Sequence, residues 1–244
     1  MPEGPSLVIL RDLLTPFAGQ EIRAAEGTSK LDLERMVGER IVAFRTWGKH
    51  LLIEFEAFSM RVHLLMFGTY RINEGKPGRE PRMSLRLDSD VINFYACALR
   101  YIEGDLDRTY DWRSDVLADA WSPRRARNKL MTRPDTLVCD ALLDQDIFAG
   151  VGNIIRNDVM YRTRIHPESR IGALPPRKLG ELIREARTYS FDFLVWKRAF
   201  VLKKHLLAHT KKNCRRCELP LLKTYPGTTG RRSFYCSGCQ VRYA

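Results

Sequence analysis

Near its carboxyl end the chain reads Cys214-Arg215-Arg216-Cys217 and, eighteen residues later, Cys236-Ser237-Gly238-Cys239. Two Cys-x2-Cys pairs are typical of a structural zinc ion held by four thiolates in tetrahedral geometry. Two disulfides are the alternative, but nothing else in the sequence indicates export, and paired x2 spacings suit a metal better than a bridge. We therefore expect one structural Zn2+ in a ribbon, with ligands Cys214, Cys217, Cys236 and Cys239.

Charge gathers around this cysteine segment. From Trp196 to the end there are twelve Lys or Arg residues and one acid, a net charge of +11, whereas the whole chain carries +12. The first 195 residues are therefore almost neutral. Such a polarised balance indicates a polyanionic partner, with nucleic acid ahead of a membrane surface because no amphipathic anchor accompanies it. A basic tail that is merely solvated is the alternative.

Composition fits a soluble globular protein of one large or two small domains. The chain has 244 residues, 44% of them hydrophobic, and a mean hydropathy of -0.32. The longest apolar runs, such as 64–67, are far too short to span a membrane, and the amino terminus lacks a secretory pattern. We expect a cytoplasmic, nucleoid-associated protein that is a monomer and does not contact membranes. Cys97 and Cys139 lie in apolar surroundings and are expected to be buried thiols.

The order of helix-like and strand-like segments predicts an α+β chain. Apolar residues recur at helical spacing over 5–17, and β-type runs follow at 41–44, 51–55, 61–64, 84–87 and 91–95. The first half is therefore predicted to be a β-sandwich behind an N-terminal helix. Segment 121–134 has five basic residues, two prolines and no acid, which favours a hinge over DNA. Helices are predicted at 137–143, 154–161 and 177–207.

The amino terminus, Met1-Pro2-Glu3-Gly4, offers a reactive group. Proline in second place permits removal of Met1, which would expose the secondary amine of Pro2 beside the Glu3 carboxylate. An α-amine has a reference pKa of ~8 against ~10.4 for lysine, so far more of it is neutral and nucleophilic at pH 7. Attack on a sugar C1′ would give a cationic iminium that favours loss of the neighbouring phosphates. Glu3 would then serve as general acid and base. Alone, this signal is weak, because many chains begin with Met-Pro.

A second constellation is Gly150-Val151-Gly152-Asn153, between two predicted helices. The two glycines allow a polyanion to approach the backbone, and the amides of a helix N-terminus then face it. Asn153 adds a helix cap or a direct donor. A tight helix-helix turn without a ligand is the alternative.

Four separated motifs together resemble the formamidopyrimidine-DNA glycosylase/endonuclease VIII family, most closely bacterial endonuclease VIII. They are Pro2-Glu3-Gly4-Pro5, Gly48-Lys49-His50, Gly150-Val151-Gly152-Asn153 and the segment from Arg231 to Gln240. The resemblance covers nearly the whole chain. It implies a β-sandwich catalytic domain at 1–120, a basic hinge at 121–134, a helix-two-turn-helix domain at 135–210 and a zinc finger at 211–244.

The resemblance also implies a reaction and roles for single residues. Pro2 would form the Schiff base, Glu3 would be the acid/base, and Lys49, Gly152, Asn153 and Arg231 would lie at phosphates flanking a lesion. Lys49 would thus belong to both the catalytic and the DNA-binding sets. The partner would be damaged DNA, from which an oxidised base is excised before β,δ-elimination cleaves the abasic strand.

The apolar triplet Leu65-Met66-Phe67 resembles the wedge that endonuclease VIII inserts in place of an extruded base. Since successive side chains of a strand alternate between its faces, at least one of the three is expected to lie in the core. Met66 is the predicted inserted residue, and Phe67 is expected to stack nearby. No guanine-capping insertion precedes the cysteines, which favours oxidised pyrimidines as substrates.

Two residues depart from the family pattern. Ser6 stands where a second glutamate is usual, and Trp47 stands where a small or basic residue is usual. Within the family, a purine-type glycosylase is the alternative. Ser6 in particular motivates a third hypothesis, a protein that binds lesions or abasic sites without excising bases.

Overall fold

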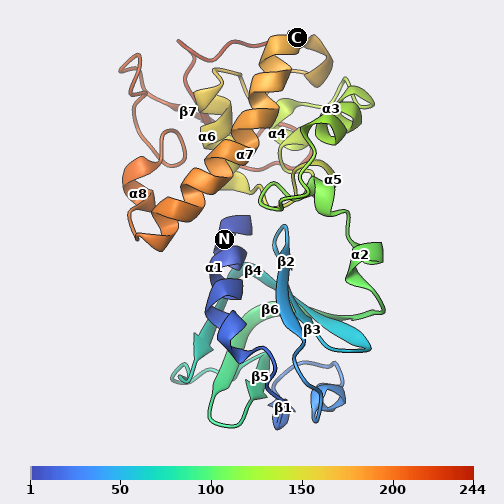
Figure 1. Ribbon diagram of the computed structural model, residues 1–244. Coiled ribbons are helices and arrows are strands. Elements are labelled where there is room, and N and C mark those ends of the chain that lie inside the picture. Colours follow the sequence, from blue (N-terminus) through green and yellow to red (C-terminus); the bar gives the residue numbers. More distant parts are fainter. Residues whose placement is uncertain (1) are drawn as a thin grey trace. The chain divides into compact units, whose positions relative to one another are not determined.

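The computed structural model describes residues 2–244, which separate by their contacts into two units, 2–110 and 111–244 (Figure 1). The predicted α+β class is confirmed: a helix and an antiparallel sheet form the first unit, and helices with a small β-hairpin form the second. No helix within 2–244 is both long enough and apolar enough to cross a membrane.

The first unit begins with helix α1 (Gly4–Leu14), which Pro5 opens and the short 3-10 turn η1 (Thr15–Phe17) extends. Leu7, Leu10 and Leu14 are fully buried and lie on one face of the helix, as their spacing predicts. This face packs on strands β2 and β3. The expected helix over 5–17 is thus present, with its last turn tightened.

Six antiparallel strands make one hydrogen-bonded sheet in the order β1-β5-β6-β4-β3-β2. Their bounds are β1 (Ala24–Glu26), β2 (Ala43–Trp47), β3 (His50–Glu54), β4 (Phe58–Ile72), β5 (Met83–Arg86) and β6 (Val91–Glu103). The 3-10 turn η2 (Glu34–Met36) precedes β2, and α2 (Leu106–Thr109) follows β6.

The long strands β4 and β6 pair in two stretches, separated by a register shift between Leu64 and Thr69. One stretch of the pair continues into β3 and β2, the other into β5 and β1. Buried residues from both halves, among them Val62, Leu85 and Phe94, share one core with α1. The β-sandwich expected from the sequence is, by its hydrogen bonds, one six-stranded sheet whose central pair of strands is interrupted at a bulge, where sheets bend.

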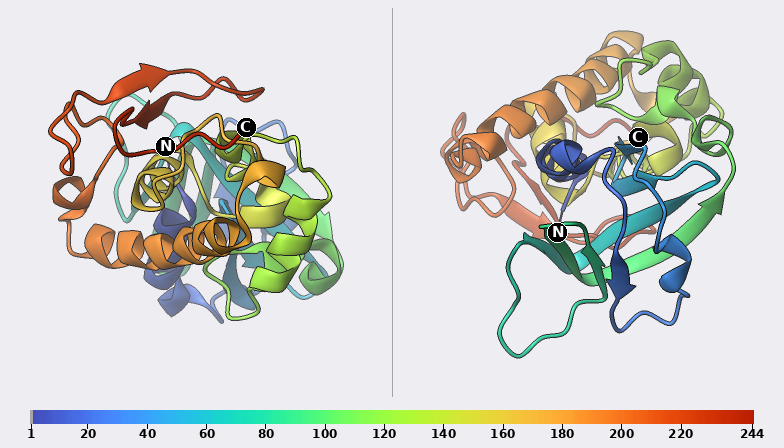
Figure 2. Two further views of the ribbon diagram at one scale, coloured as in Figure 1. Left: turned by 90° about the horizontal axis from the view of Figure 1, so that it is seen from above. Right: turned by 60° about the horizontal axis from the view of Figure 1, so that its bottom comes forward.

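The second unit is mainly helical. Its elements are η3 (Trp112–Ser114), α3 (Pro123–Met131), α4 (Val138–Ala141), α5 (Gln145–Phe148), α6 (Asn153–Arg162), η4 (Ile171–Ala173), α7 (Pro176–Arg198), α8 (Leu202–His205), β7 (Leu222–Thr224) and β8 (Ser233–Tyr235). Helix α7 runs beside α6 in all views, orange beside yellow (Figures 1 and 2). Their contact forms the centre of the second core.

Two predicted segments differ in detail from the structure. Within the expected hinge at 121–134, Ser122 caps helix α3, and Ala126 and Leu130 are buried in the second core. The single helix expected over 177–207 ends at Arg198, because Phe200 adopts a φ of +58°, a left-handed conformation that an α-helix cannot contain. The short helix α8 follows.

Candidate functional site

Pro2 and Glu3 lie at the amino end of α1. Pro2 is half-buried, and Glu3 is the N-cap residue of the helix, in an extended conformation. The Glu3 side chain is 1% exposed. Glutamate is rarely buried so fully, so its burial marks this carboxylate as a candidate functional group. Ser6 lies one helical turn on and donates its backbone N–H to the Glu3 carbonyl at 2.7 Å.

Lys49 sits at the tip of the hairpin between β2 and β3. Trp47 pairs with His50 across a two-residue turn formed by Gly48 and Lys49. Gly48 has a φ of +56°, the value that a primed hairpin turn demands at this position. The half-buried Lys49 is therefore presented by a rigid turn rather than by a flexible loop.

Next to this turn, the aromatic rings of Trp47, His50, His63 and Tyr110 pack in a cluster. The Trp47 ring lies 5.0 Å from the ring of Tyr110 and 5.6 Å from that of His50, centroid to centroid. The Tyr110 hydroxyl and Nδ1 of His50 are 3.3 Å apart, and His63 meets His50 edge-on at 5.4 Å. Trp47, a departure from the family pattern, thus serves here as a packing partner of the hairpin.

Burial lowers the pKa of His50 to about 3, and the charges of Arg61, His63 and Lys49 act in the same direction. Burial likewise lowers the pKa of His63, with Lys49 and Arg61 contributing. Both imidazoles are therefore neutral at physiological pH. The two histidines therefore add no positive charge beside Lys49 at the tip of the hairpin.

These histidines predict a loss of stability in acid. The pKa of histidine in an unfolded chain is ~6.5, whereas the pKa of His50 in the folded protein is about 3. Between these values the unfolded state binds more protons, so acidification favours unfolding. We expect thermal unfolding between pH 7 and 4 to show a fall in stability that His50→Gln reduces by up to about 3 kcal/mol. An unchanged pH slope in the variant would contradict the assignment.

Leu65, Met66 and Phe67 occupy the register shift of β4. Their side chains are 45%, 49% and 81% exposed. The expectation that at least one of them belongs to the core was wrong. The shift between Leu64 and Thr69 takes these residues out of the ladder, so the alternation of faces does not apply. A Cβ on Gly68 would come within 2.8 Å of Leu64 Cα, so glycine is needed to close the bulge.

In the second unit, Gly152 is the N-cap of α6 and Asn153 is its first residue. The Asn153 Nδ2 donates to the carbonyl of Arg232 at 3.1 Å. The helix start and the turn before β8, which carries Arg231, are therefore brought together although they are far apart in the sequence. Arg231 itself is exposed.

Two further residues of α6, which sequence reasoning missed, hold the same turn. The fully buried Arg156 donates to the carbonyls of Arg231 and Arg232 at 3.1 and 2.8 Å and to Oγ of Ser233 at 2.8 Å. Asn157 donates to Arg232 and accepts from the Phe234 N–H at 2.7 Å. The only signal in the sequence was their helical spacing from Asn153.

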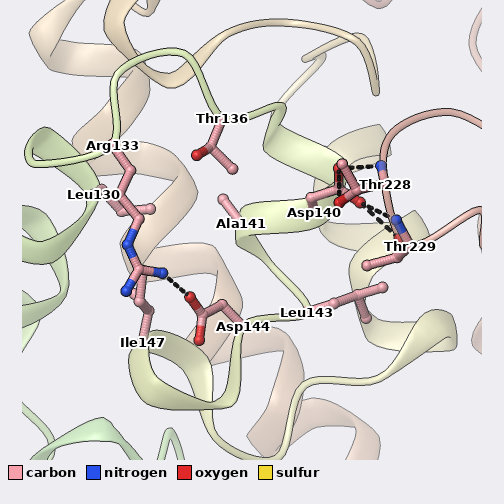
Figure 3. A pocket seen from close by; sticks show the side chains of 10 residues that line it. All are labelled: Leu130, Arg133, Thr136, Asp140, Ala141, Leu143, Asp144, Ile147, Thr228 and Thr229. Atoms are coloured by element: carbon pink, nitrogen blue, oxygen red, sulfur yellow. Dashed lines mark hydrogen bonds and ion pairs between the residues drawn. The ribbon is translucent and has the colours of Figure 1, made fainter.

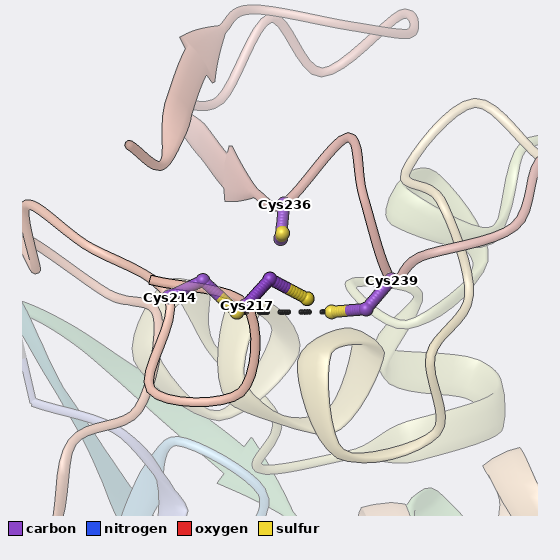
Figure 4. A group of neighbouring side chains, drawn as sticks. All are labelled: Cys214, Cys217, Cys236 and Cys239. Atoms are coloured by element: carbon purple, nitrogen blue, oxygen red, sulfur yellow. Dashed lines mark hydrogen bonds between the residues drawn. The ribbon is translucent and has the colours of Figure 1, made fainter. Parts of the chain in front are cut away.

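The four cysteines of the ribbon cluster as expected. Their sulfur atoms all lie within 4.8 Å of one another (Figure 4), and all four thiols are free. Cys214 Sγ and Cys239 Sγ are 3.7 Å apart. Ligands ~2.3 Å from a tetrahedral zinc are separated by about 3.8 Å, so the spacing fits such an ion. The predicted buried thiols Cys97 and Cys139 are indeed buried and lie outside the cluster.

Donors around the cluster also suit a set of thiolates. The Tyr161 hydroxyl lies 3.2 Å from Cys214 Sγ, and the Arg216 guanidinium lies 3.2 Å from Cys239 Sγ. Arg216 also stacks over the Tyr161 ring at 3.8 Å. Hydrogen bonds of this kind orient ligands and offset their negative charge.

Both units match models of known protein domains. The model of the formamidopyrimidine-DNA glycosylase N-terminal domain matches residues 1–101, and that of the formamidopyrimidine-DNA glycosylase H2TH domain matches 115–189. Endonuclease 8 2 of Mycobacterium tuberculosis is 28% identical over 84% of this chain and 85% of its own. Formamidopyrimidine-DNA glycosylase of Geotalea uraniireducens is also 28% identical, over 98% and 100%.

Longer relatives match as well. Endonuclease 8-like 3 of Xenopus laevis is 28% identical over 98% of this chain, which spans only 40% of that protein. Among solved structures, a viral DNA glycosylase superposes with a TM-score of 0.85 at 18% identity, covering 98% of this chain and 100% of the other. The formamido-pyrimidine DNA glycosylase of Lactococcus lactis, bound to DNA with an AP site, gives 0.86 at 21%, with the same coverage. Both structures share the fold.

Proposed function

Because the chain belongs to the formamidopyrimidine-DNA glycosylase/endonuclease VIII family, we propose that it is a bifunctional DNA glycosylase and AP lyase of base excision repair. The observation that carries the proposal is the buried Glu3 carboxylate directly after Pro2, at the start of α1. A secondary amine and an adjacent acid are the two groups that the chemistry needs.

In the proposed reaction, the Pro2 nitrogen attacks C1′ of the damaged nucleotide while the glycosidic bond breaks. Glu3 supplies the proton for base departure and ring opening. The resulting iminium draws electrons from the sugar, so the 3′ and then the 5′ phosphate leave by β- and δ-elimination. Water finally hydrolyses the iminium and frees Pro2. The scheme requires loss of Met1, which lies outside the described residues.

Lys49, Asn153 and Arg231 are proposed to bind phosphates on either side of the lesion, together with the amide of Gly152. Lys49 is presented by a glycine turn, and Asn153 and Arg231 are held in one network. The net charge of +11 beyond residue 195 supports damaged DNA as the partner. We propose a monomer acting on DNA in the cytoplasm, and we propose that the basic segment 121–134, which packs within the second unit, lies over the DNA.

The four cysteines are proposed to hold one structural zinc ion. It would fix the ribbon that carries Arg231, and it would take no part in the bond-breaking steps.

Oxidised pyrimidines are the proposed preferred substrates. The exposed triplet Leu65–Phe67 supplies a contiguous apolar wedge, of which Met66 is the candidate for insertion into the helix. The endonuclease 8 relative and the formamidopyrimidine-DNA glycosylase relative described above are both 28% identical to this chain. Sequence identity alone therefore does not assign the chain to the pyrimidine or the purine branch of the family.

A panel of oligonucleotides tests the substrate class. We expect faster release of thymine glycol or dihydrouracil than of 8-oxoguanine, read on a denaturing gel. Met66→Ala should lower excision by about tenfold or more, because an apolar wedge offsets an unstacking cost of about a few kcal/mol per base step, and should spare cleavage of a preformed abasic site. Leu13→Ala, at a similar exposure of 48% on α1, is the control. Faster release of 8-oxoguanine would assign the chain to the purine branch.

Ser6 supports the alternative of a binding protein without base excision. It lies in the first turn of α1, close to Glu3, at the place where the family usually has a carboxylate. If that absence limits the reaction, Ser6→Glu should raise the excision rate in the same gel assay. Tight binding of abasic DNA without any cleavage, before and after the substitution, would favour the binding protein.

A further inference from the structure

The segment from Gly227 to Gly230, which leads to Arg231, is tied to helix α4 by one carboxylate. Asp140 accepts the backbone N–H of Thr228 at 2.8 Å and that of Thr229 at 3.2 Å (Figure 3). Both threonine hydroxyls donate to it as well, at 3.2 and 2.6 Å. Each carboxylate oxygen therefore receives one backbone and one side-chain hydrogen bond, an arrangement that fixes the segment in position and in rotation.

The backbone of this segment is shaped for that contact. Gly227 has a φ of +73°, and a Cβ built there would lie 2.2 Å from Oδ2 of Asp140. Any other residue at 227 would push the carboxylate away as well as strain the backbone. Gly230 closes the turn with a φ of +54°.

The other side of the turn is held by α6. Arg156 and Asn157 bind the carbonyls and amide of residues 231–234. The turn that presents Arg231 is thus gripped between α4 and α6, through contacts that involve none of the four cysteine sulfurs. The turn therefore has a support besides the proposed metal, and a change at Asp140 leaves the four thiols in place.

We propose that Asp140 is a positioning residue for Arg231, which aims the guanidinium at the DNA phosphate by clamping Thr228 and Thr229. The inference rests on the proposed DNA-binding function of Arg231. It assigns part of the DNA affinity of the ribbon to a short helix of the helical unit.

The negative charge of Asp140 cannot itself attract DNA, so any contribution of Asp140 to DNA binding comes from the geometry of the turn. An acid beside a phosphate-binding turn weakens DNA binding through simple electrostatics. Burial tends to raise the pKa of Asp140, but the four hydrogen bonds from Thr228 and Thr229 outweigh it and lower the pKa. The carboxylate is therefore ionised at neutral pH, and its benefit must come from holding the turn.

Asp144 provides a matched control. It lines the same cavity of about 260 Å³ as Asp140, together with Arg133, Thr228 and Thr229. Asp144 pairs with Arg133 and caps α5, and none of its hydrogen bonds or ion pairs described for residues 2–244 reaches the ribbon. Asparagine retains helix-capping ability, so Asp144→Asn removes the charge and leaves the cap.

The experiment measures the affinity of the zinc-loaded full chain for abasic-site DNA over a range of salt. Asp140→Asn places an amide N–H against one pair of threonine donors and releases that side of the turn. We expect a fall in affinity of about threefold to tenfold and a salt slope flatter by about 1, the signature of one lost phosphate contact. Thr229→Val, which keeps the carboxylate, should give a smaller fall. Asp144→Asn should leave affinity equal or higher.

A double-mutant cycle shows whether Asp140 affects DNA affinity through Arg231. If Asp140 acts through Arg231, adding Asp140→Asn to Arg231→Ala should cost no further affinity. Additive losses, or an Asp140→Asn variant that binds as tightly as Asp144→Asn, would overturn the inference and leave the DNA-binding role of Arg231 intact. If Arg231→Ala alone binds DNA like the unaltered protein, that role fails, and the inference fails with it. Zinc content and thermal unfolding of each variant identify a loss caused by misfolding.

Discussion

Glu3→Gln should reduce base excision by about 10²–10⁴-fold, the usual contribution of a positioned general acid or base. Cleavage of a preformed abasic site should fall much less, because the lyase steps draw mainly on the iminium formed by Pro2. Glutamine has almost the size of glutamate, so the substitution removes the proton donor with little change in packing around this buried side chain. Single-turnover gels with a lesion duplex and with an abasic duplex give the two rates.

Glu26→Gln removes an equal charge from an exposed position at the end of β1 and serves as the control for net charge. It should leave both rates unchanged. Equal losses of excision and abasic cleavage in Glu3→Gln would show that Glu3 is needed for Schiff-base formation or for folding, and its assignment as the acid for base departure would fail.

Cys236→Ser should abolish stoichiometric zinc and weaken DNA binding. Native protein with reduced thiols is expected to contain about one zinc per chain, since the four sulfurs fit a tetrahedral ion. Without zinc the two cysteine pairs are no longer linked, and the segment that carries Arg231 is held less firmly. The affinity for DNA should therefore fall at least about tenfold, which corresponds to the loss of one charge-assisted hydrogen bond. Metal analysis and DNA titration measure the two effects.

The first unit has a core of its own and should remain folded in this variant, which circular dichroism of its strands can follow. Cys97→Ser removes a buried thiol from that unit without touching the ribbon and is the matched control. Native protein with substoichiometric zinc, or unaltered DNA binding by Cys236→Ser, would contradict the role of the metal.

Much of the fold could be predicted because local patterns agree with the tertiary structure. The heptad-like spacing of Leu7, Leu10 and Leu14 identifies α1, and Gly48 marks the hairpin between β2 and β3. The two Cys-x2-Cys pairs locate the ribbon and its cluster of sulfurs. In each case a short stretch of chain contains the physical cause of the structure.

The bulge in β4 could not be predicted in this way. Its three exposed apolar residues depend on a register shift against β6, and therefore on where another strand happens to pair. The break after α7 is similar, since no glycine or proline announces the left-handed Phe200. Periodicity describes regular elements, and both features are interruptions of one.

The network behind Arg231 was missed for a related reason. Asp140 and Thr229 are separated by 89 residues, and Arg156 and Ser233 by 77. A single sequence contains no sign that such residues meet. Asn153 was found because of the glycines before it, whereas its helical neighbours Arg156 and Asn157 had no comparable mark.

Borohydride trapping of the protein on abasic DNA tests the central claim most directly. The secondary amine of Pro2 should form an iminium with C1′, which borohydride reduces to a stable amine, and peptide mapping of methionine-processed protein should place the DNA on Pro2. A trapped adduct at Pro2 supports the proposed lyase. Tight binding of abasic DNA with no trapped adduct, or an adduct on a lysine such as Lys49, would contradict it.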